Sequence, residues 1–190
     1  TLIETIYSLF FENRSRHIYQ QNFTIHKDME YIIQPLIGVN EFVFGGYRKD
    51  ILDKTNLKIK TTREEKDGNN SFIIDDYGDF LAYYNQHDQR LFFLTFAPLP
   101  NVKLILEGKN LFEMKASDVY QQLSSHDNIL LEEDYVGFAS SVLGIDIYAP
   151  NFADDKDCVC EGISVAVKGY FDAIYKAESW DIETLLSEAF

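Results

Sequence analysis

The sequence predicts a single α+β domain. Its antiparallel sheet is built from two repeats, each a helix followed by strands, with helices on one face and further helices at the termini. Composition supports one sizeable core, because 46% of the 190 residues are hydrophobic and 15% are aromatic. Runs of aromatic and β-branched residues separated by turn signals predict the strands. The repeat is indicated by residues 42–52, FVFGGYRKDIL, and their counterpart in residues 111–123, LFEMKASDVYQQL.

The first part of the chain, through the first repeat at residues 36–100, reads as helix, strand and helix before a run of strands. Apolar residues at helical spacing predict a helix over residues 2–12, with a weaker one near 14–21. A strand at 41–45 ends in two glycines, which favour a turn into a short helix with Ile51 facing inward. The polar stretch KTTREEKDGNN predicts a loop or the tip of a solvated strand pair. SFIIDDYG, DFLAYYN and RLFFLTFAP then predict strands, and two prolines end the unit.

The second repeat, at residues 101–171, follows the same order. VKLIL predicts a strand and KASDVYQQLSS a helix that buries Val119 and Leu123. Two further strands, the acidic loop FADDKD and an alternating strand, ISVAV, complete it. Residues 178–190 predict a C-terminal amphipathic helix, which Ser179 or Asp181 could cap.

Negative charge is concentrated in the second half of the chain. The net charge is −14, and residues 101–190 hold 17 acidic and 6 basic residues. Such a surface repels bare nucleic acid and attracts a basic protein. The alternative is that the acidity only keeps the protein soluble.

No motif in the sequence indicates catalysis. Asp75, Asp76 and Asp79 could pair as catalytic carboxylates, but strand alternation puts the first two on opposite faces, and a solvated surface is the preferred interpretation. NFADDKDCVCE lacks the spacing of a calcium loop, and the four histidines share no spacing with a nucleophile. We therefore expect no enzyme activity, no metal and no cofactor.

Two cysteines, Cys158 and Cys160, are too close in sequence for a relaxed disulfide. We expect them to be reduced, which favours a cytoplasmic protein. The apolar runs are too short to cross a membrane, so no membrane contact is predicted.

Four stretches resemble a group of small bacterial proteins: GVNEFVFGGYRKDIL, LAYYNQHDQRLFFLTFAP, LILEGKNLFEMKASDVYQQL and ISVAVKGYF. The resemblance covers residues 36–171 and identifies the group as immunity proteins encoded beside polymorphic or contact-dependent toxins. Gly46 and Tyr47 stand where the pattern of the group has Met and Ser, and the 35 N-terminal residues have no counterpart in it.

The resemblance implies an inhibitor that binds a cognate toxin and covers its functional surface. Many such toxins are basic nucleases, and the acidic half of the chain fits a partner of that charge. The expected contacts are the acids of two clusters: Glu132, Glu133, Asp134, Asp154, Asp155 and Asp157. Two other functions stay open, a carboxylate-dependent hydrolase or ligand-binding protein and a homo-oligomeric structural adaptor.

Overall fold

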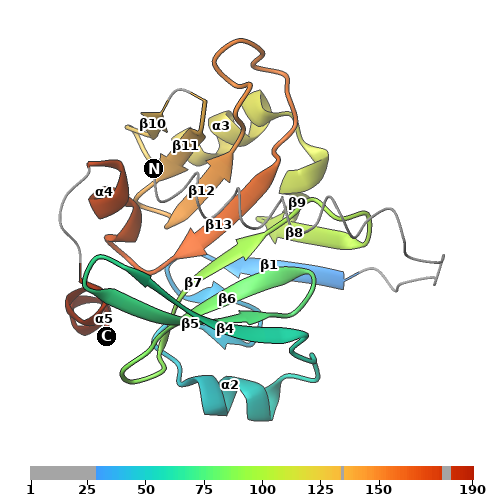
Figure 1. Ribbon diagram of the computed structural model, residues 1–190. Helices are drawn as coiled ribbons and strands as arrows, with labels where there is room; N and C mark the ends of the chain where they lie inside the picture. Colours follow the sequence, from blue (N-terminus) through green and yellow to red (C-terminus); the bar gives the residue numbers. More distant parts are fainter. Residues whose placement is uncertain (1–28, 134, 177–180) are drawn as a thin grey trace.

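The protein folds into two β-sheets with short helices around them (Figure 1). The computed structural model describes residues 29–133, 135–176 and 181–190. The helices predicted at 2–12 and near 14–21, and the alternative cap Ser179, lie outside these residues. The structure confirms the α+β class, with mostly antiparallel strands.

The larger sheet has eight strands in the order β10-β11-β12-β13-β7-β6-β5-β4. It consists of two antiparallel meanders that meet where β7 pairs with β13, Phe96 opposite Ile163. The strands are β4 (Thr61–Asp67), β5 (Asn70–Asp76), β6 (Phe80–Asn85), β7 (Leu91–Phe96), β10 (Leu131–Glu133), β11 (Gly137–Ser140), β12 (Ile145–Tyr148) and β13 (Gly162–Ala166). The polar stretch before β5 is therefore an edge strand, in agreement with the solvated strand pair.

The strands that precede each repeat's helix form a second sheet, so the prediction of one antiparallel sheet is wrong. Its order is β3-β2-β1-β8-β9, and β1 and β8 are parallel, with Tyr31 opposite Leu104. The strands are β1 (Met29–Gln34), β2 (Gly38–Val39), β3 (Phe42–Val43), β8 (Val102–Leu106) and β9 (Lys109–Asn110). The physical reason is that the central strands of the large sheet are buried along their whole length, so the sheet needs cover on both faces.

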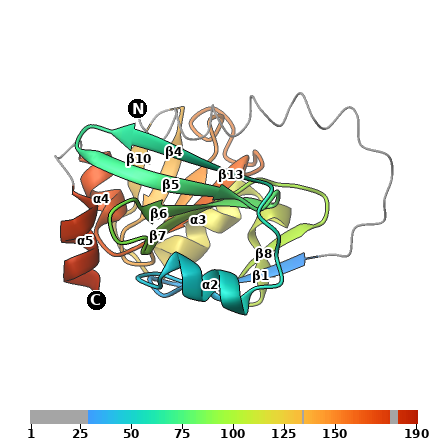
Figure 2. The ribbon, with the colours of Figure 1, turned by 60° about the horizontal axis from the view of Figure 1, so that its bottom comes forward.

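One face of the large sheet packs against the small sheet and the two repeat helices (Figure 2). The strand register places a row of apolar residues along this face: Phe80, Phe96, Ile163, Ile147 and Phe138. Tyr31 of β1 lies 5.3 Å from the Phe80 ring, and Tyr120 of α3 (Ala116–Ser124) lies 5.1 Å from Phe138. The helix α2 (Arg48–Lys54) reaches the same face through Asp75 of β5.

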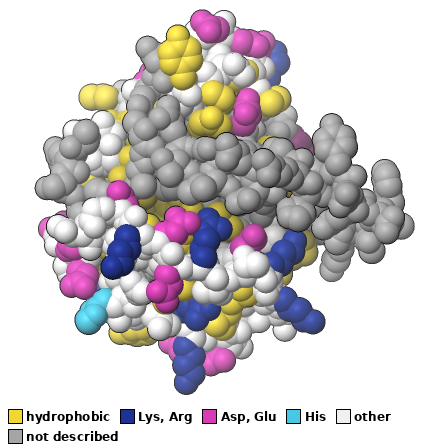
Figure 3. All heavy atoms as spheres, viewed as in Figure 1, with side chains coloured by type: hydrophobic (Ala, Val, Ile, Leu, Met, Phe, Trp, Pro, Cys, Tyr) yellow, Lys and Arg dark blue, Asp and Glu magenta, His cyan; other side chains and the backbone are white. Residues whose placement is uncertain are grey.

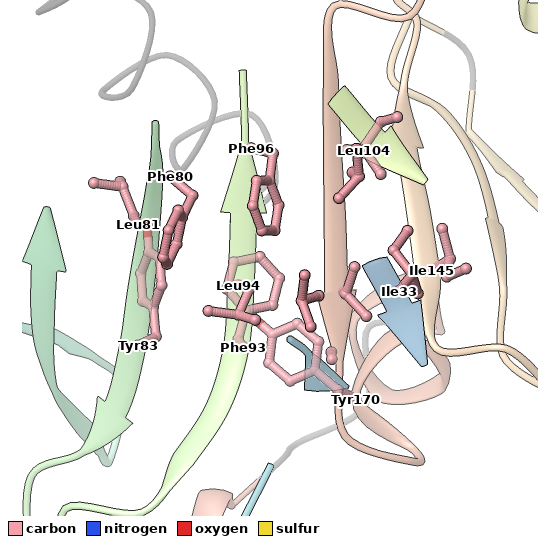
Figure 4. Packing of buried hydrophobic residues seen from close by; sticks show 14 of the residues in the cluster. Ile33, Phe80, Leu81, Tyr83, Phe93, Leu94, Phe96, Leu104, Ile145 and Tyr170 are labelled. Atoms are coloured by element: carbon pink, nitrogen blue, oxygen red, sulfur yellow. The ribbon is translucent and has the colours of Figure 1, made fainter. Parts of the chain in front are cut away.

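A helix, α4 (Tyr170–Tyr175), packs on the opposite face, which makes "helices on one face" wrong as a description of the whole fold. Tyr83 and Phe93 face each other across β6 and β7, and Phe93 lies 5.1 Å from Tyr170 (Figure 4). These side chains continue the core beyond the sheet. The sheet carries apolar residues on both faces, so a single helix layer cannot bury it.

The C-terminal helix α5 spans Ile182–Ala189 and is capped as predicted. The Asp181 carboxylate accepts a hydrogen bond from the Thr184 backbone N–H at 2.8 Å. Between α4 and α5, residues 177–180, which include Trp180, lie outside the described residues. A short 3₁₀ helix, η2 (Leu111–Glu113), precedes α3.

The glycine turn of the first repeat also agrees with the sequence. Gly45 has a φ of 75°, a conformation that L side chains adopt rarely, and it connects β3 to α2. Backbone hydrogen bonds join Gly45 and Gly46 to Leu91 at 2.8 and 3.0 Å. Ile51 of α2 is buried, as predicted.

Candidate functional site

The loop between β12 and β13 carries three of the predicted contact residues. It runs over residues 149–161, and the Glu161 N–H closes it by donating to the Tyr148 carbonyl at 2.8 Å. Asp154, Asp155 and Asp157 all lie in it and are exposed. Turn hydrogen bonds from the N–H groups of Asp154 and Asp155 to the Asn151 carbonyl give the loop a defined shape.

The start of α3 holds this loop in place. The Ala116 N–H donates to the Cys158 carbonyl at 2.8 Å, and the Ser117 N–H donates to the Lys156 carbonyl at 2.9 Å. Asp157 pairs with the Lys115 ammonium and accepts a hydrogen bond from the Ser117 hydroxyl. These two partners lower the pKa of Asp157, and the same pairing raises that of Lys115. The Lys115 ammonium therefore partly offsets the charge of Asp157.

Glu132 reaches the same surface from β10. Its carboxylate accepts a hydrogen bond of 2.6 Å from the Tyr120 hydroxyl, which raises the pKa of that tyrosine. The backbone of Glu133 belongs to β10, and Asp134 lies outside the described residues. Of the first acidic cluster, Glu132 thus lies on the same surface as the loop that carries the second cluster. We call this surface, made of loop 149–161, the start of α3 and β10, the acidic end.

Aromatic rings form the floor of the acidic end. Phe152 of the loop stacks on Tyr120 at 5.5 Å between centroids, with an interplanar angle of 23°. Both rings contact Phe138 of β11, at 4.8 Å from Phe152 and 5.1 Å from Tyr120. Phe138 is fully buried, so this cluster connects the loop to the core.

Two shallow hollows open over this floor. Their volumes are about 220 and 310 Å³, and Glu132, Phe152 and Lys156 line both. The Lys156 ammonium lies 3.8 Å from the centre of the Phe152 ring, a cation–π contact. A carboxylate, two aromatic rings and a cation therefore meet at one place on the surface.

Loop 149–161 is acidic, with four carboxylates and one lysine. Burial, and after it Asp155 and Glu161, raise the pKa of Cys158, whereas Lys156 acts in the opposite direction. Figure 3 shows acidic side chains next to a basic one at the top of the molecule, where Figure 1 places this loop. The surface thus combines exposed acids with aromatic area, a combination that suits a basic protein partner.

The other carboxylate cluster does not form a site. Asp75 is completely buried and bound by Arg48, so the expectation of a solvated surface is wrong for this residue. Asp76 accepts a hydrogen bond from the Gly78 N–H, and Asp79 accepts one from the Tyr31 hydroxyl. Within the described residues, no group of three His, Cys, Asp or Glu side chains is placed to hold a metal ion.

Sequence reasoning missed the residues between the two acidic clusters. The apolar spacing of KASDVYQQLSS predicts a helix that contains Tyr120 but gives Tyr120 no role in binding, and no motif marks Phe152 or Lys156. One signal was available, because an aromatic residue inside an acidic, turn-rich loop is more often docked on a neighbour than solvated. Its partner, Tyr120, is distant in sequence and carries no local signal.

Comparisons with known proteins add no relative. No family model, characterised protein or solved structure matches the chain. Among the helices of the described residues, none has both the length and the apolar character that a membrane span requires.

Proposed function

We propose that this protein is a non-enzymatic, cytoplasmic immunity protein that neutralises a basic protein toxin, such as a nuclease, by binding its functional surface through the acidic end. One observation carries the proposal: Glu132 and Phe152 line two hollows, and the loop that carries Phe152 also carries the exposed Asp154, Asp155 and Asp157. Acids steer a basic partner toward the surface, and aromatic rings supply contact area once it arrives.

The choice of this surface is supported by a comparison of the two repeats, which make the same backbone contacts at the start of their helices. In the first repeat, Tyr47 forms an antiparallel β-bridge with Arg90, and the Arg48 N–H donates to the carbonyl of Gln89, the residue before Arg90. Lys115 forms a bridge with Val159, and the Ala116 N–H likewise donates to the carbonyl of Cys158. At an offset of 68 residues between the repeats, Tyr47 aligns with Lys115 and Arg48 with Ala116, so aligned residues make the same two backbone contacts. We therefore propose that the halves derive from one duplicated unit.

The two units differ most at the acidic end. In the first, β6 and β7 are joined by the short turn 86–90, whereas β12 and β13 are joined by loop 149–161. Insertions in repeated units lie in surface loops, and these often serve binding. The extra residues of the acidic loop, which precede Cys158, therefore distinguish the second unit.

The first test is capture of the tagged protein's partner from its own organism, with elution across a salt gradient and identification by mass spectrometry. A small basic protein, recovered one to one and silenced when this chain is added, is the expected result. Recovery of the chain alone, or only with copies of itself, would contradict the proposal and favour the adaptor.

The second test locates the interface with charge reversals. Asp154→Lys with Asp155→Lys is compared with Asp50→Lys with Asp53→Lys, which has the same net charge and places the change on exposed positions of α2. At low salt, we expect the loop variant to bind at least about tenfold more slowly than the α2 variant, with a similar dissociation rate. Equal association rates for the two variants would remove the acidic end from the interface.

A further inference from the structure

We propose that the hollow of about 310 Å³ beside Phe152 binds one cationic side chain of the protein partner, preferably an arginine. In the free protein, the Lys156 side chain occupies this site. The inference rests on the proposed function for the identity of the partner. The affinity of the hollow for a cation is a separate property, which can be measured on this chain alone.

The contact of Lys156 with Phe152 is the starting point. Its ammonium lies 3.8 Å from the ring centre, well inside the range of about 6 Å for a cation–π contact. The face of the Phe152 ring thus already contacts a cation, and the adjoining hollow of about 310 Å³ leaves space next to the ring.

The Lys156 side chain can leave without disturbing the loop. Its backbone carbonyl accepts the Ser117 N–H at 2.9 Å, and this bond does not involve the side chain. The residue is exposed, so its ammonium can move into water. Phe152 itself stays fixed by the Tyr120 and Phe138 rings.

Glu132 supplies the charge that a partner's cation would meet. It lines both hollows, and the Tyr120 hydroxyl holds its Oε1 atom at 2.6 Å. A guanidinium can stack on an aromatic ring and donate two parallel hydrogen bonds to a carboxylate, whereas an ammonium acts as a point charge. A held carboxylate beside an aromatic ring therefore favours arginine over lysine.

The test is an NMR titration with N-acetyl-arginine amide, following the backbone amides of Ser117 and Gln121, which line the hollow of about 310 Å³. Removal of the competing cation in Lys156→Ala should tighten binding about threefold, in keeping with the strength of an exposed cation–π contact. The control is Lys168→Ala, which removes the same charge from an exposed position after β13. Equal affinities for these two variants would overturn the proposal.

Two further comparisons sharpen the result. In the Lys156→Ala background, Glu132→Gln should weaken binding about threefold or more, because the paired charge is lost. N-acetyl-lysine amide should bind less tightly than the arginine compound. Tighter binding of spermidine than of either amino-acid amide would overturn the assignment to a protein side chain. Because the titration uses no partner, it can show binding of the arginine compound even if partner capture fails. Equally, a basic partner can be captured even if the hollow does not bind the arginine compound.

Discussion

Arg48 and Asp75 form a two-point ion pair that fastens α2 to the large sheet. The Arg48 Nε and Nη2 atoms donate to the two oxygens of Asp75 at 2.7 and 2.9 Å, and the Thr62 hydroxyl adds a third hydrogen bond at 2.7 Å. Asp75 is completely buried, whereas Arg48 is partly exposed. A buried carboxylate with three donors is satisfied only while this geometry persists.

Replacement of Asp75 by Asn should therefore destabilise the fold. The amide presents a donor where Arg48 needs an acceptor, and breaking a buried pair costs about 3 kcal/mol of unfolding free energy. The measurement is urea denaturation at pH 7. Asp53→Asn makes the same chemical change at an exposed position of α2 and should stay within about 0.5 kcal/mol of the wild type.

A paired replacement separates the ion pair from simple loss of packing. Arg48→Met with Asp75→Leu removes both charges and leaves neither partner unmatched. This double variant should be more stable than Asp75→Asn alone, since apolar replacements of buried pairs are often neutral. If it is less stable, the cost arises from packing rather than from the unmatched charge.

The two cysteines should be slow to react in the folded protein. Burial raises the pKa of Cys160 to about 12, so at pH 8 only about one molecule in ten thousand carries the reactive thiolate. A thiol-specific reagent should label Cys160 only after unfolding, and Cys158→Ser isolates this signal. Labelling of native Cys158→Ser at the rate of free cysteine would contradict the burial of Cys160.

Local signals in the sequence were sufficient for the β6–β7 hairpin and the repeat helices. They were not sufficient before the acidic loop, where the two expected strands are three, β10, β11 and β12. Aromatic and β-branched residues with the turn NQHDQ predict β6 and β7, and the glycines before Tyr47 predict the start of α2. The small sheet was missed because its central pairing is parallel and joins Tyr31 to Leu104, which are far apart in the chain. No local pattern reports such a contact.

The candidate site could be predicted only in part, again because no local pattern reports contacts between elements that are distant in the sequence. The exposure of Asp154 and Asp155 follows from composition and turn signals. Burial of Asp75 does not, because its partner Arg48 lies on another element and only the fold brings them together. The role of Phe152 likewise depends on Tyr120, which α3 brings beside the loop.

The cap of α5 should contribute stability that depends on pH. Hydrogen bonds from Thr184 lower the pKa of Asp181 below that of the unfolded chain. The contribution is therefore complete above the unfolded pKa of about 3.9 and disappears as the pH falls through the lower, folded value. Asp181→Ala should cost about 1 kcal/mol at pH 7 and much less near pH 2.5.

A matched change checks that this difference belongs to the cap. Glu188→Gln removes a carboxylate from an exposed position near the other end of α5. Urea denaturation at the two pH values should show little change in the difference between this variant and the wild type. If Asp181→Ala loses the same free energy at both pH values, the ionised carboxylate is not what caps the helix.

Buried tyrosines should make the protein sensitive to alkali. Burial raises the pKa of Tyr83, Tyr84 and Tyr170. Because their folded pKa lies above the unfolded value of about 10, stability is complete below that pH and falls as the pH rises beyond it. Absorbance at 295 nm and circular dichroism, followed together from about pH 9 to 12, should show a late group of tyrosines that ionises as the fold is lost.

Tyr84→Phe removes one of these hydroxyls, so the unfolding free energy of this variant should decline less steeply above about pH 10 than that of the wild type. Ionisation of all tyrosines near pH 10 with the dichroism spectrum unchanged would mean that these hydroxyls reach solvent in the folded protein.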